Sequence, residues 1–274
     1  MITAALHKRK QTYLDLAILI RTDNTVSTIH DFRVASRNLL ALEPLLRKGS
    51  DTSHWKIMMR KWLKTLNQVR DIQVLQEILV GHVEIEPLLL THKRNCLKEW
   101  QEISRTIADK NFQDDLISSL ETYCCRIEAE PAFFDQTVFS LWLKTFQKVQ
   151  IALQHADHEH PISLHKLRLR YKSLRYLATF IYDVGIVDTL DFPRLKYWQD
   201  LLGSIQDLEV GINWLRYSRV ASNLINDLSL ESHRLRIKYR DEKEKFGQNI
   251  MEMDNFIRSG IQNIKLNSQA VTKI

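Results

Sequence analysis

Two pairs of similar segments, repeated at one spacing, restrict most strongly how this chain can fold. IHDFRVASRNLL at 29–40 is similar to LHKLRLRYKSLR at 164–175, and WLKTLNQVRDIQV at 62–74 is similar to WQDLLGSIQDLEV at 198–210. Each second copy follows the first by about 135 residues, as expected when one structural unit is duplicated. We therefore predict two repeats, 1–130 and 131–274, joined near AEPAF at 129–133.

The repeated unit is predicted to be helical. Only 7 Gly and 5 Pro occur among 274 residues, too few turn residues for many short strands. Stop signals stand at Gly49-Ser50, Gly81, Pro131 and Pro161. The apolar periodicity predicts helices at 3–21, 28–48, 52–80, 86–128 (one long or broken helix), 133–156, 162–185, 190–219 and 222–266. The predicted fold is all-α, with two four-helix bundles related by an approximate two-fold axis.

Composition indicates a cytoplasmic protein with an anionic partner. Lys and Arg number 39 against 33 Asp and Glu, and this basic excess favours anions. Cys96, Cys124 and Cys125 include an adjacent pair and no CxxC spacing, which is a poor arrangement for disulfides. The N-terminus does not resemble a signal peptide, and no segment approaches the roughly 20 apolar residues of a membrane span.

The later of the two similar segments places its cations in one stripe of a helix. On a helical wheel His165, Arg168, Lys172 and Arg175 lie within about 80° of each other. Apolar residues flank the stripe on both sides, Leu164, Leu167, Tyr171, Leu174 and Ala178 on one and Leu169, Tyr176 and Phe180 on the other. Cations between two apolar flanks are not typical of a solvated face, so we expect them to line a groove between helices.

The earlier segment repeats this pattern. His30, Arg33 and Arg37 lie between Ile29, Phe32 and Leu39 on one side and Val34 and Leu45 on the other. Desolvating several like charges is costly unless a counter-charge is present. Carboxylates on neighbouring helices could provide it, which would be a structural role. A bound anion could also provide it.

The predicted helix starts favour the anion. Ser27 or Thr28 is predicted to cap one helix and Ser163 the other, with a histidine two or three residues inside each. Unpaired N–H groups and the helix dipole attract anions there, and the same dipole disfavours a charged imidazole. We expect each histidine to be neutral in the free protein and to gain charge when phosphate binds.

The tryptophan segments are predicted to support the groove. Trp62 and Trp198 are interpreted as core anchors. Arg60, Lys64, Asn67 and Asp71 share one helix face, so Arg60 and Lys64 are predicted to extend the basic groove, although Asp200 replaces Lys64 in the second repeat. Asp71 and Asp207 are interpreted as partners that orient Arg or His rather than as catalytic acids.

These four segments resemble the CHAD domain, the conserved histidine α-helical domain, over nearly the whole chain. The resemblance implies two four-helix bundles around a basic central pore or cleft that binds inorganic polyphosphate. In some members it also implies location at polyphosphate granules and contact with granule proteins. Matching positions give the anion-contacting role to His30, Arg33, Arg37, His165, Arg168, Lys172 and Arg175.

The sequence departs from the family in two ways. Asn38 and Leu40 stand where members commonly have further basic residues, so we expect weaker binding by the first half. CHAD domains often accompany a triphosphate tunnel enzyme domain with an ExExK motif. The nearest string here, Glu84-Ile85-Glu86-Pro87, lacks the Lys, so that enzymatic half is expected to be absent.

Enzymatic alternatives receive little support from the sequence. His30-Asp31 could indicate a metal phosphohydrolase, but the second repeat reads His165-Lys166. His155, His158 and His160 could bind a transition metal, although a solvated linker beside Pro161 is the preferred interpretation. Neither GxxxxGK(S/T) nor GxSxG occurs. We expect no enzyme activity, cofactor or metal.

Two other binding functions remain open. Nucleic acid is also a polyphosphate, but a base-reading protein usually exposes its cations beside aromatic or amide partners. A scaffold or regulator of a phosphate-metabolising enzyme could use the predicted helix 222–266 as a docking surface, with Arg234, Lys238 and Glu242 exposed.

Overall fold

A computed structural model describes residues 1–46, 53–83, 85–107, 109–218 and 222–271. Every regular element in this part of the chain is an α-helix, which confirms the predicted all-α class. The helices are α1 (Ile2–Leu19), α2 (Val26–Leu46), α3 (His54–Ile78), α4 (Glu86–Ser104), α5 (Lys110–Ala129), α6 (Pro131–Gln154), α7 (Pro161–Asp183), α8 (Phe192–Ser218) and α9 (Ser222–Val271).

The helix ends follow from local chemistry at several predicted positions. Gly81 follows α3 with a φ of 91°, a left-handed conformation that glycine adopts without steric cost. Prolines stand in the first turns of α6 and α7, where the missing N–H removes no helical hydrogen bond. The predicted stop at Gly49-Ser50 lies outside the described residues.

The segment 86–128, predicted as one long or broken helix, forms two helices, α4 and α5. It breaks after Ser104, and α5 starts after Asp109, whose side chain accepts a hydrogen bond from the Asn111 N–H. This is a typical N-cap, and it stabilises the start of a new helix.

The predicted caps of α2 and α7 are wrong. Ser27 and Thr28 lie inside α2, and the Thr25 hydroxyl accepts the Thr28 N–H at 3.3 Å instead. Ser163 lies inside α7, where its hydroxyl donates to the His160 carbonyl. His30 and His165 are therefore more than one turn inside their helices, beyond the unpaired N–H groups of the first turn.

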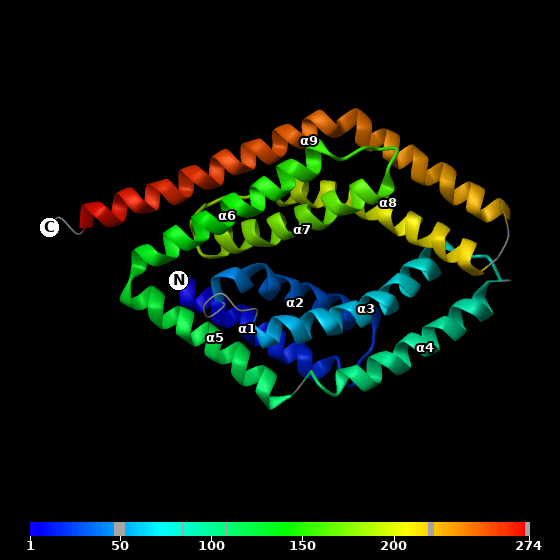
Figure 1. Cartoon of the computed structure of the whole chain (residues 1–274), viewed down its shortest axis with the longest axis horizontal. Coiled ribbons are helices and arrows are strands. Elements are labelled where there is room, and N and C mark those ends of the chain that lie inside the picture. The colour runs from blue at the N-terminus through cyan, green and yellow to red at the C-terminus, as the bar shows by residue number, and fades with distance from the viewer. Residues whose placement is uncertain (47–52, 84, 108, 219–221, 272–274) are drawn as a thin grey trace.

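The helices of the two halves meet along a central seam. In Figure 1, α1 to α5 occupy the lower part of the molecule and α6 to α9 the upper part. Across the seam α2 packs against α7 and α3 packs against α8. Among the other helices, α4 packs on α3, α5 on α1, α2, α3 and α6, and α9 on α6 and α8. The seam therefore brings together the four helices that carry the repeated motifs.

Aromatic residues fill the core on both sides of the seam. Trp62 and Trp198 are 0% and 1% exposed, which confirms that both are core anchors. One continuous hydrophobic cluster contains residues from both halves. A smaller cluster, with Leu75, Leu208, Ile212 and Leu228, joins α3 to α8 and α9. No helix in the described part of the chain combines the length and apolar character needed to cross a membrane.

Candidate functional site: a buried cationic cluster

The first half contributes two arginines that share one acceptor. Arg33 and Arg37 stand one turn apart on α2, and both are partly buried. Their Nη2 atoms donate to the Asn67 side-chain oxygen on α3, at 3.0 and 3.2 Å. One amide oxygen therefore holds two guanidinium groups side by side against the seam.

The second half contributes Arg168 and Lys172 from α7. Arg168 Nη2 lies 3.9 Å from Asp207 Oδ1 on α8, an ion pair too long for a hydrogen bond. Burial and the charges of Arg168, Arg37 and Arg33 together lower the pKa of Lys172 to about 6. Burial and the charge of Arg37 likewise lower the pKa of Arg33 to about 9. Cations of both halves thus lie close enough to repel each other.

Two carboxylates accompany these cations. Burial raises the pKa of Asp207, whereas Arg168, Arg70 and Lys172 lower it. Asp71 is an exposed residue, but the surrounding protein partly desolvates its carboxylate and so raises its pKa. The charges of Arg33 and Arg168 act in the opposite direction and lower it. Both aspartates therefore lie near arginines of opposite charge, and their role as orienting partners stays a prediction. We call Arg33, Arg37, Arg168, Lys172, Asp71 and Asp207 the central cluster.

The two histidines occupy different environments. His165 is partly buried and bonds to the Gln206 side chain. Burial lowers its pKa, and Arg168 and Lys172 lower it further, so the imidazole is neutral near pH 7. Its Nδ1 is buried without a hydrogen-bond partner among the described residues. His30 is exposed in a surface hollow that is also lined by Arg70 and Glu77.

The remaining predicted residues lie outside the central cluster. Arg60 and Lys64 are exposed on α3, about two turns and one turn from Asn67 respectively, and their role in a groove stays a prediction. Arg175 is partly buried, with its guanidinium carbon 5.5 Å from the centre of the Tyr176 ring. Of the apolar flanks, Leu169 is an exception because it is 50% exposed.

Sequence reasoning missed three participants. Arg70 acts on Arg33, Asp71 and Asp207 through its charge and forms an ion pair with Glu77 at 3.0 Å. The Gln206 side chain is hydrogen-bonded to His165, and Gly203 lies next to the Arg168 guanidinium group. A signal existed for the first two, because Arg70 and Gln206 directly precede the matched aspartates of the two repeats.

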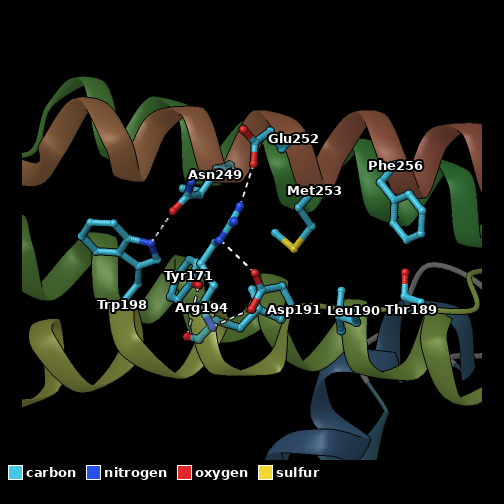
Figure 2. A pocket seen from close by; sticks show the side chains of 12 residues that line it. Tyr171, Thr189, Leu190, Asp191, Arg194, Trp198, Asn249, Glu252, Met253 and Phe256 are labelled. Atoms are coloured by element: carbon cyan, nitrogen blue, oxygen red, sulfur yellow. Dashed lines mark hydrogen bonds and ion pairs between the residues drawn. The ribbon is translucent and has the colours of Figure 1, made fainter.

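A separate cavity, between the start of α8 and α9, contains a cation that is paired with carboxylates. Figure 2 shows Arg194 at this pocket, between the carboxylates of Asp191 and Glu252. The two ion-pair distances are 2.9 and 2.7 Å, so this cation is already neutralised. Trp198, beside it, donates from Nε1 to the Asn249 side chain at 3.0 Å. The cavity therefore lacks the excess positive charge of the central cluster.

Two other groups of predicted residues, the histidines of the α6–α7 connection and the polar residues of α9, lie away from the central cluster. His155, His158 and His160 lie at the α6–α7 connection, whose carbonyl groups accept hydrogen bonds from Arg236 and Lys243. No cluster of metal-ligating side chains is found in the described part of the chain. Arg234 and Lys238 are exposed as expected, but Glu242 is partly buried and accepts from the Tyr197 hydroxyl.

Comparison with known proteins identifies the family. The CHAD domain model matches residues 4–216, most of the chain and both repeated motifs. The chain belongs to the CHAD domain family. The crystal structure of the CHAD domain from the plant Ricinus communis is similar, with a TM-score of 0.60 and 14% sequence identity over 95% of this chain and 90% of that one. No curated protein matches the chain by sequence. The solved CHAD structure thus shares the fold, and the likeness extends past residue 216 into α9.

Proposed function

We propose that this CHAD domain binds inorganic polyphosphate without catalysis, in a basic cleft between α2 and α7. The central cluster supports this most directly. Arg33, Arg37, Arg168 and Lys172 come from two helices and are held together although they repel each other. A polyanion would offset that repulsion, and each charge-assisted hydrogen bond to it contributes about 1.5–3 kcal/mol.

The proposed cleft continues to the surface on the first-half side. Arg70 acts through its charge on Asp71, and it also lines the surface hollow beside His30. A linear chain of phosphates could contact the buried cations and leave past these two residues. In this proposal the two four-helix bundles arise by duplication, so that equivalent residues surround one ligand. Contact with polyphosphate granules and their proteins is part of the same proposal.

The proposed site is tested by Arg168→Ala combined with Lys172→Ala. We expect polyphosphate affinity, measured by fluorescence anisotropy, to fall at least tenfold, because two charge-assisted contacts are lost. The matched control is Lys166→Ala with Arg170→Ala, which removes the same residue types from the exposed side of α7. Equal affinities for the central double variant and the wild type, with helicity intact in both, would refute the site.

Nucleic acid is the competing ligand, because its backbone offers the same phosphate oxygens. Labelled polyphosphate bound to the wild-type domain should resist displacement by single- and double-stranded DNA and RNA at matched phosphate concentration and near-physiological salt. A cluster recessed between packed helices admits a thin unbranched chain more readily than a duplex. Displacement by nucleic acid at matched concentration would favour the competing function.

A further inference from the structure

The two halves of the central cluster differ at one pair of equivalent positions. The spacing that matches Trp62 with Trp198 and Asp71 with Asp207 also matches Asn67 with Gly203. Asn67 supplies the oxygen that accepts hydrogen bonds from both α2 arginines. Gly203 has no side chain, so α8 offers no equivalent acceptor to the cations of α7.

Arg168 lies directly over this glycine. A Cβ atom at Gly203 would stand 3.9 Å from Arg168 Nε and 4.0 Å from its Nη2, which is ordinary van der Waals contact. Any longer side chain there would therefore meet the guanidinium group. A glycine inside a helix costs about 0.5–1 kcal/mol relative to alanine. At this position the absence of a side chain leaves a space about as large as one methyl group beside Arg168.

Arg168 has fewer of its N–H donors in hydrogen bonds than Arg33 and Arg37 of the first half. Its Nε is buried without a hydrogen-bond partner among the described residues, and its ion pair with Asp207 spans 3.9 Å. Arg33 also has an unpartnered Nε, but its Nη2 and that of Arg37 donate to Asn67. His165, one turn before Arg168, adds a buried Nδ1 that likewise lacks a partner.

We propose that Gly203 makes the second half of the cluster the principal phosphate subsite. Phosphate oxygens there accept the Arg168 and Lys172 donors in the space that a side chain at position 203 would fill. In the first half the Asn67 oxygen already occupies the equivalent space, and Arg33 and Arg37 contribute mainly through their charge. This inference rests on the proposed function and identifies the part of the site that contacts the anion most closely.

The test exchanges the two equivalent residues in the full chain, with short-chain inorganic polyphosphate as the probe. Gly203→Asn supplies Arg168 with a competing acceptor and fills the space, so affinity should fall about tenfold, the loss of roughly one charge-assisted hydrogen bond. Asn67→Gly releases two guanidinium groups, so the affinity should stay at the wild-type value or increase. Gly203→Ala is the control, with a raised melting temperature and an affinity lowered less than by Gly203→Asn.

The outcomes separate this inference from the proposed function. Wild-type affinity in a folded Gly203→Asn variant would overturn the inference and leave polyphosphate binding in place. A tenfold lower polyphosphate affinity of the Asn67→Gly variant would also overturn the inference. If Gly203→Asn does not fold, the affinity of Asn67→Gly decides the test. No binding by the wild-type domain would overturn both.

Discussion

Lys172 shows how the fold prepares a single residue for an anion. Its ammonium group is partly buried on α7 and faces Arg168 on its own helix, Arg33 and Arg37 on α2, and Asp207 on α8. Burial and the three arginines lower its pKa to about 6, so most of the lysine is neutral at pH 7 in the free protein. A bound polyanion would restore the charge, because an adjacent negative charge favours the protonated form.

This lowered pKa has a consequence for stability. Between pH 6 and the ordinary lysine pKa of 10.5, the unfolded chain holds a proton on Lys172 that the folded protein lacks. Stability from this group therefore rises with pH across that window. Lys172→Met should increase the free energy of unfolding at pH 7 by on the order of 1 kcal/mol and reduce this slope. Urea denaturation at several pH values measures both. An unchanged slope would show that Lys172 is not buried among cations.

At the scale of the helices, one buried carboxylate, Asp254, joins α9 to α6. Asp254 is 2% exposed, accepts the Trp142 Nε1–H at 2.7 Å and pairs with Arg258 at 2.8 Å. We expect Asp254→Ala to destabilise the protein by about 2 kcal/mol or more, because it leaves a buried donor unsatisfied and a cation unpaired.

Chemical denaturation of the Asp254 variants checks this expectation. Asp254→Asn retains an acceptor for Trp142 and loses only the charge, so its loss should be smaller than that of Asp254→Ala. If both variants were as stable as the wild type, the α6–α9 contact would not depend on this carboxylate.

Helical periodicity was enough to predict most of the elements but not their ends. The stripe of Arg168 and Lys172 was predictable because apolar residues repeat around it with the helical period. The caps were not predictable: several Ser and Thr residues stand near the start of α2, and Ser163, the one Ser or Thr near the start of α7, lies inside that helix. The position of the break between α4 and α5 was not predicted, because the connecting residues contain no Gly or Pro and only Asp109 marks it. The role of Gly203 could not be predicted, because the sequence does not show that Arg168 lies next to it.

At the scale of the whole molecule, the halves are held together by contacts outside the central cluster. Arg9 on α1 forms a 2.6 Å ion pair with Asp183 at the end of α7, and its side chain is only 9% exposed. At another point of the seam, Leu75 on α3 packs with Leu208 and Ile212 on α8. These contacts stabilise the arrangement that keeps like charges close, so the cluster need not stabilise the fold itself.

The central claim is that cations from both halves hold one polyphosphate chain. A crystal structure of the domain with a medium-length polyphosphate tests it most directly. We predict phosphate density at the seam between α2 and α7, with hydrogen bonds from Arg168 and Lys172 and with Arg33 and Arg37 nearby. Density confined to another surface, such as the exposed faces of α4 or α9, with the central cluster unchanged, would contradict the account.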